Sequence, residues 1–127
     1  MDDLSGLVIS ACIEVHRALG PGLLESAYEA CLARELALRE LPFQRQVPVP
    51  LDYKGERVDV GFRLDLLVDG HLIVELKADQ GSLNLARAQV LTYLKITGLH
   101  LGLVVNFNHP RLVDGLTRVV LDLRDPA

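Results

Sequence analysis

Residues 62–77 read FRLDLLVDGHLIVELK, and this stretch decides the fold. Two apolar runs flank Asp69-Gly70, a typical turn pair, so the stretch predicts two antiparallel strands. Buried carboxylates are costly unless a metal ion or a neighbouring cation compensates their charge. Charged side chains nevertheless interrupt both apolar runs, namely Asp65 in the first and Glu75 and Lys77 in the second. The stretch therefore predicts both a pair of antiparallel strands and the place of a functional site.

Side-chain alternation along the two strands constrains their register. A two-residue turn would pair Val68 with His71. It would also place Leu64 opposite Glu75 and Asp65 opposite Val74, so that a charged side chain would lie opposite an apolar one on both faces. A three-residue loop with Gly70 in the left-handed conformation, or a bulge, shifts the register by one. We therefore predict an odd-length loop or a bulge, with Asp65, Glu75 and Lys77 on one face and, on the other, Leu64, Leu66, Val68, Leu72, Val74 and Leu76.

Length and composition predict one compact domain over residues 1–127, because 127 residues of which 50% are hydrophobic suffice for a single core. The apolar runs are shorter than the roughly 20 residues of a membrane span, and the N-terminus has no signal-peptide pattern. We therefore expect a cytoplasmic protein without a membrane partner. The net charge of −4 argues against a broad basic surface for nucleic acid, but not against a local one.

The remaining elements follow from periodicity and from breaking residues. Apolar residues at helical spacing predict a helix over 4–19 and a second one over 24–36, with Cys12 and Cys31 as buried free thiols on their apolar faces. Strands are expected from residue 44 to a turn at 54–55, then over 57–68, 71–78, 99–107 and, at a sheet edge, 118–123. Ser82 and Gly98 bracket another helix. The fold class is therefore α/β, a sandwich around one mixed sheet.

The hairpin charges have a specific chemical use. Two carboxylates offer the hard oxygen ligands that Mg²⁺ or Mn²⁺ prefers, and a lysine beside them can orient a water or stabilise charge on a phosphate. A buried ion pair that only orders the sheet is the structural alternative. Phosphate loops of the GxxxxGK type, GxSxG elbows and CxxC pairs are missing from the sequence. The carboxylate site is therefore the enzymatic option that the sequence leaves.

The same residues carry a family resemblance. The order of elements is similar to the restriction-endonuclease-like αβββαβ core of the PD-(D/E)XK nuclease superfamily, and Asp65 with ELK at 75–77 resembles its defining motif. QVLTY at 89–93 resembles the QxxxY motif of RecB-like members. GLLESAY at 22–28 is similar to the signature of the small bacterial GxxExxY proteins. Together with Glu14-Val15-His16 and Val105-Asn106-Phe107, the resemblance covers nearly the whole chain.

This resemblance implies a metal-dependent nuclease whose metal ligands are Asp65, Glu75 and, from a helix, Glu25. Lys77 would activate the nucleophile, and Gln89 would position Lys77, water or phosphate. Several alternatives stay open. Glu25 could instead favour the positive end of a helix dipole, and Tyr28 and Tyr93 could belong to the core or to the site. A residue of the first helix could replace Glu25; the candidates are His16 and Glu14, both expected to be partly exposed.

The sequence thus predicts a Mg²⁺- or Mn²⁺-dependent nuclease acting on DNA. The alternative is a catalytically silent module that keeps the nuclease fold for nucleic-acid binding or assembly. A domain this small has little surface with which to choose a substrate, so a homodimer or a protein partner is also left open. DNA against RNA and endo- against exonucleolytic cleavage are not decided by the sequence.

Overall fold

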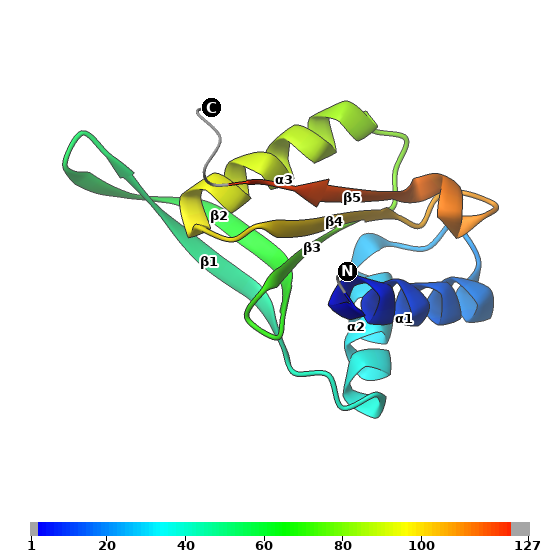
Figure 1. The fold of residues 1–127 in the computed structure, drawn as a ribbon. Helices are drawn as coiled ribbons and strands as arrows, with labels where there is room; N and C mark the ends of the chain where they lie inside the picture. Colours follow the sequence, from blue (N-terminus) through cyan, green and yellow to red (C-terminus); the bar gives the residue numbers. More distant parts are fainter. Residues whose placement is uncertain (1–2, 123–127) are drawn as a thin grey trace.

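The computed structural model describes residues 3–122, with side chains at 4–58 and 62–122. One mixed sheet of five strands lies between α1 and α2 on one face and α3 on the other (Figure 1). The elements are α1 (Asp3–Leu19), α2 (Glu25–Leu38), β1 (Phe43–Tyr53), β2 (Glu56–Val68), β3 (Leu72–Lys77), α3 (Leu83–Thr97), β4 (Leu101–Asn106), the 3₁₀ helix η1 (Leu112–Gly115) and β5 (Leu116–Val120). This arrangement confirms the predicted fold class.

The strands lie in chain order, β1-β2-β3-β4-β5. The first three form the predicted antiparallel meander, and β4 lies parallel to β3. A parallel neighbour requires a crossover, which α3 provides. The edge position predicted for the last strand is confirmed, although β5 begins earlier, at Leu116, and ends at Val120. Leu123, the predicted end of that strand, lies outside the described residues.

The β2–β3 turn has the odd-length loop that the alternation predicts. Val68 pairs with Leu72, so the loop consists of Asp69, Gly70 and His71. Gly70 is left-handed with a φ of 67°, and Asp69 has a φ of 53°. The His71 amide donates to the Val68 carbonyl oxygen at 3.0 Å, which closes the turn. The predicted register of the hairpin is therefore confirmed.

One face assignment in this hairpin is wrong. Leu66 and Val68 pack under α1 and α2 as expected, but Leu64 belongs to the core under α3. The regular alternation breaks between them, because the β1–β2 ladder omits the pair of Gln46 and Asp65, and Gln46 has a φ of 51°. Strand β2 therefore changes the face that it buries where the charged residue lies. Since helices cover both faces, apolar side chains are needed on each.

The two N-terminal helices differ from expectation at two residues. The buried residues of α2 include Tyr28, Leu32 and Leu36, which recur every fourth position, whereas Cys31 is exposed. A residue next to Leu32 lies about 100° around the helix from it, so Cys31 turns away from the core. Leu24 is 77% exposed because it precedes the first helical turn. Cys12 is buried as predicted, and burial raises the pKa of its thiol to about 12.

Helix α3 begins and ends where the sequence predicts. The Ser82 hydroxyl oxygen accepts a hydrogen bond from the Leu85 amide at 3.2 Å, and Gly98 is left-handed with a φ of 75°. These are the usual N-terminal and C-terminal capping arrangements. Within residues 3–122, none of the helices combines the length and the apolar character needed to cross a membrane.

Candidate active site

Glu75 and Lys77 alternate with the buried leucines of β3 and therefore share a face. Glu75 is only 7% exposed. Its Oε2 atom lies 3.6 Å from the Lys77 Nζ atom, while its Oε1 atom is buried and has no hydrogen-bond partner. A carboxylate oxygen without a partner is costly in the interior, so this atom is a candidate ligand for a cation.

Asp65 lies beside this pair because β2 separates from β3 at that point. The β2–β3 ladder runs from the Val68–Leu72 pair to the Leu66–Val74 pair. The next link is made by a side chain, since Asp65 Oδ2 accepts the Leu76 amide hydrogen at 2.8 Å. This bond satisfies a backbone donor and fixes the carboxylate against β3.

Glu25 is the helix-borne acid that the structure brings to these strands. It lies in the first turn of α2, which has no side-chain cap at Leu24. Burial first, and then the charge of Asp65, raises the pKa of Glu25. The influence of Asp65 indicates that Glu25 lies near the strand carboxylates, although Glu25 is an exposed residue that can also favour the start of the helix.

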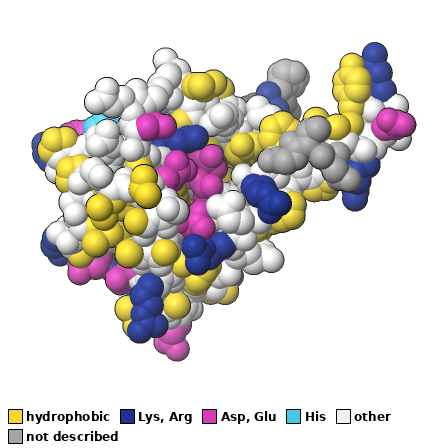
Figure 2. All heavy atoms as spheres, turned by 180° about the vertical axis from the view of Figure 1, so that it is seen from behind, with side chains coloured by type: hydrophobic (Ala, Val, Ile, Leu, Met, Phe, Trp, Pro, Cys, Tyr) yellow, Lys and Arg dark blue, Asp and Glu magenta, His cyan; other side chains and the backbone are white. Residues whose placement is uncertain are grey.

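The strand carboxylates also perturb each other. Burial, the charge of Asp65 and then that of Glu25 raise the pKa of Glu75 to about 8, against a lowering effect of Lys77. Burial also raises the pKa of Asp65, although the Leu76 amide opposes it. Acidic side chains gather in the middle of the face shown in Figure 2, with basic ones beside them. The three carboxylates therefore hold more negative charge than Lys77 neutralises, which favours a cation.

Glu29 is a site neighbour that the sequence reasoning missed. It is 8% exposed and lies one helical turn after Glu25. Its two oxygens accept hydrogen bonds from Arg45 Nε at 3.0 Å and from Gln46 Nε2 at 2.7 Å. Its charge is among those that raise the pKa of Asp65. The spacing of four from Glu25 was the available signal, because it places both acids on one helix face.

Helix α3 supplies Gln89 and Tyr93 from the other side. Gln89 has a buried Oε1 atom without a hydrogen-bond partner, and it lines the same cavity as Lys77. Tyr93 is 8% exposed and packs edge-on against Phe62, with ring centroids 6.0 Å apart. Burial and the charges of the strand carboxylates raise the pKa of Tyr93. Tyr93 therefore lies near the strand carboxylates and Gln89 lies near Lys77, while their roles stay predictions.

Tyr28 is a core residue in this structure. Its side chain is fully buried, and its ring stacks on Phe107 with centroids 4.3 Å apart. Its hydroxyl donates to the Gly20 carbonyl oxygen at 2.6 Å and accepts the Leu23 amide hydrogen at 3.1 Å. Tyr28 thereby anchors the loop before Glu25, and all of its described contacts are structural.

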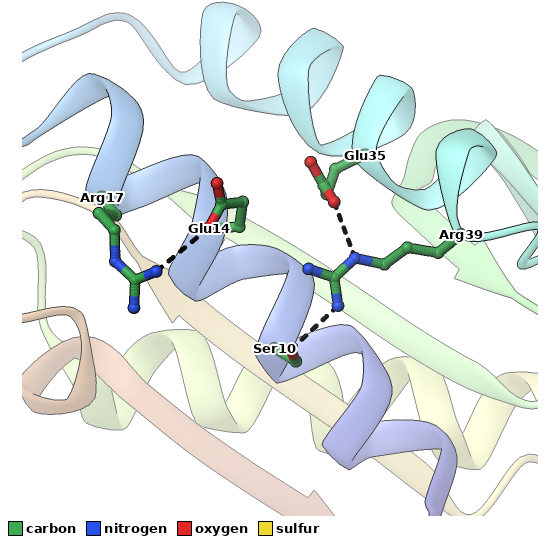
Figure 3. A network of polar contacts seen from close by, with 5 residues as sticks. All are labelled: Ser10, Glu14, Arg17, Glu35 and Arg39. Atoms are coloured by element: carbon green, nitrogen blue, oxygen red, sulfur yellow. Dashed lines mark hydrogen bonds and ion pairs between the residues drawn. The ribbon is translucent and has the colours of Figure 1, made fainter.

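Glu14 and His16, the two candidates in α1, make their contacts away from the three carboxylates. Glu14 pairs with Arg17 at 3.4 Å, beside the Ser10–Arg39–Glu35 contacts that join α1 to α2 (Figure 3). His16 donates from Nε2 to the His109 carbonyl oxygen at 2.8 Å. Both are partly exposed, as predicted. Neither is among the charges that shift the pKa values of the three carboxylates, which favours Glu25 as the third acid.

A cavity of about 220 Å³ opens beside Lys77, between the ends of β3 and β4 and the start of α3. Its lining includes Asp79, Asn106 and Gln89. The Asn106 side chain donates from Nδ2 to the Asp79 carbonyl oxygen at 2.9 Å, which ties the ends of the two parallel strands together. The cavity gives the lysine and the glutamine a shared space in which a substrate group can lie.

The donor set fits a divalent cation of the hard type. Among the side chains described, at 4–58 and 62–122, no group of three from His, Cys, Asp and Glu is arranged to hold a metal ion by itself. Mg²⁺ does not require one, because it usually keeps several waters and is held by one or two carboxylates. The unpartnered Oε1 atom of Glu75, next to Asp65, meets that requirement.

Comparison with known families agrees with this geometry. The sequence pattern that describes the PD-(D/E)XK nuclease superfamily matches residues 2–119. The chain belongs to this superfamily, whose members are usually nucleases that use divalent metals. No curated protein and no solved structure is similar enough to the chain to count as a match.

Proposed function

We propose that this protein is a Mg²⁺- or Mn²⁺-dependent nuclease that hydrolyses phosphodiester bonds in DNA. One observation carries the proposal: Glu75 is a buried carboxylate with an unpartnered oxygen, next to Asp65 and to the Lys77 ammonium. When bound, the metal ion would supply a water of lowered pKa and stabilise charge on the phosphate.

The three acidic residues would bind the ion in different ways. Asp65 and Glu75 would provide the direct ligands, since both are fixed on neighbouring strands. Glu25 would complete the site from α2, directly or through a water. Its raised pKa in the presence of Asp65 supports this assignment, because a cation would relieve the same repulsion.

Lys77 and Gln89 would act on the nucleophile and the phosphate. Lys77 lines the cavity, where its ammonium could donate to the attacking water or to a phosphoryl oxygen. The free Oε1 atom of Gln89 could accept a hydrogen bond from that water or from Lys77 itself. The two side chains would thereby orient the water for attack.

Exposed basic residues support a nucleic-acid substrate. Lys54, Arg57 and Arg63 are exposed on the long β1–β2 hairpin, which extends away from the rest of the sheet in Figure 1. Lysine and arginine on such an arm can bind phosphates without base readout. Asp52 pairs with Arg57 at 3.7 Å and Glu56 is exposed at the tip, so Lys54 and Arg63 are the basic residues of the arm that we propose for phosphate binding.

The test combines metal binding with cleavage. Wild-type protein with Mn²⁺ or Mg²⁺ should cleave DNA in an assay of single-stranded DNA, duplex DNA and single-stranded RNA. Lys77→Ala should abolish cleavage and keep Mn²⁺ binding by titration calorimetry, whereas Asp65→Ala should weaken binding. Lys95→Ala, which removes an exposed lysine from α3, is the matched control and should cleave normally.

Two results would contradict the proposal. Undiminished cleavage by Lys77→Ala would remove the role given to that lysine. Mn²⁺ binding without cleavage of any of the three substrates would support the alternative, a catalytically silent module that binds nucleic acid or assembles with a partner.

A further inference from the structure

We infer that Gln46, held by Glu29, is a positioning residue that orients the Asp65 carboxylate for metal binding. The inference rests on the proposed function and extends it to a pair of residues outside the superfamily motif. The sequence motifs did not single out either residue. Their contacts in the folded chain identify them.

The backbone places Gln46 across from Asp65. Their neighbours pair as Arg45 with Leu66 and Val47 with Leu64, while the pair between them is omitted from the ladder. Gln46 has a φ of 51°, a region that residues other than Gly, Asn and Asp seldom adopt. Backbone strain of this kind persists where surrounding contacts hold it, often at functional sites.

The side chain of Gln46 contacts two carboxylates. Its Nε2 atom donates to Glu29 Oε1 at 2.7 Å. The same side chain lies opposite Asp65 on the neighbouring strand, near enough to lower the pKa of that carboxyl group. An amide nitrogen carries two hydrogens, so one nitrogen can serve both acceptors. Gln46 thus bridges helix α2 and strand β2.

Glu29 is the anchor of this bridge and is not itself a free ligand. Both of its oxygens already accept hydrogen bonds, one from Gln46 and one from Arg45. It is also nearly buried, at 8% exposure, so its position is well defined. Its negative charge strengthens the bond to the Gln46 amide, which keeps the second amide hydrogen directed at Asp65.

Asp65 is therefore held from two sides, by the Leu76 amide at 2.8 Å and by Gln46. Partners that orient a ligating carboxylate typically change metal affinity by about 10- to 100-fold when they are removed. Since Gln46 is exposed and has a positive φ, stability alone does not explain a glutamine at this position. Orientation of a ligand gives a reason for it.

The test separates stability from binding. Gln46→Gly relieves the left-handed strain but also removes the hydrogen bond to Glu29, so the two effects oppose each other and the melting temperature of the metal-free protein should change little. Its Mn²⁺ dissociation constant should nevertheless increase about tenfold. Gln44→Gly, made two residues earlier on β1 where the side chain is also exposed and φ is not positive, is the matched control. It should lower the melting temperature and leave Mn²⁺ binding unchanged.

The outcomes separate this inference from the proposed function. Equal Mn²⁺ affinity in wild type and Gln46→Gly would overturn the inference, whatever the melting temperature. Absence of Mn²⁺ binding by the wild-type protein would overturn the proposed function, and the inference with it. If Gln46→Gly fails to fold, Gln46→Asn replaces it, because Asn tolerates the left-handed backbone but is one methylene shorter; it too should bind Mn²⁺ more weakly.

Discussion

Glu75 should make the metal-free protein less stable as the pH rises. The folded chain keeps the Glu75 proton up to a pKa of about 8, whereas the ordinary value is 4.5. Between these values the folded state binds more protons than the unfolded state, so stability is highest below the lower value and falls towards the upper one. One proton corresponds to a slope of about 1.4 kcal/mol per pH unit.

The expected loss of folding stability is large enough to measure. From pH 5 to pH 7 the loss amounts to about 3 kcal/mol, a large part of the roughly 5–15 kcal/mol that stabilises a typical domain. For a chain of this size, the melting temperature should fall by about 10 °C over the same range. Burial causes most of the effect, since Glu75 is 7% exposed. Asp65 and Glu25 shift in the same direction and add to it.

Chemical denaturation in EDTA at several pH values measures this slope. Glu75→Gln cannot ionise, so its stability should depend less on pH and should exceed that of the wild type near pH 8. Glu56→Gln changes an exposed acid at the tip of the β1–β2 hairpin and should keep the wild-type slope. Wild-type stability that is flat or rises from pH 5 to pH 7, or an equally steep fall in Glu75→Gln, would refute the reasoning.

Three further predictions concern the ion, the loop and the sheet. The melting temperature should rise with the logarithm of Mg²⁺ concentration in wild type, and this rise should be absent in Asp65→Ala; calorimetry measures both. Tyr28→Phe keeps the ring stack but loses two loop hydrogen bonds, so denaturation should show a loss of about 1–3 kcal/mol. Gly102→Ala adds a methyl group that meets the Val90 side chain, and overpacking should destabilise by about 1–3 kcal/mol; a stability equal to wild type would contradict the close packing of α3 on β4.

Local chemistry explains the successful parts of the sequence prediction. Gly70, Ser82 and Gly98 act through their own backbone conformation or through a neighbour within a few residues. The alternation of charged and apolar residues then requires an odd-length loop or a bulge between β2 and β3, and the structure has the loop. The superfamily motif at Asp65 and Glu75 lies on these strands, so the strand part of the candidate site was predicted together with the fold.

The errors and omissions depend on contacts between distant residues. Leu64 packs on the unexpected face because the ladder with β1 breaks opposite Asp65, which no pattern within β2 reveals. Glu29 and Gln46 are 17 residues apart and meet only when α2 packs beside β1. Cys31 is exposed because the buried stripe of α2 is narrower than its apolar residues suggest.

The order of elements, the register of the β2–β3 hairpin and the position of Asp65, Glu75 and Lys77 on it are predictable from the amino acids alone, since backbone preference and side-chain alternation are local properties. The choice of helix acid that joins these residues, and the orientation of Asp65, come from the folded chain. Both depend on burial and on charges brought together from separate elements, and the desolvation of a carboxylate and its repulsion by another exist only once the chain has folded.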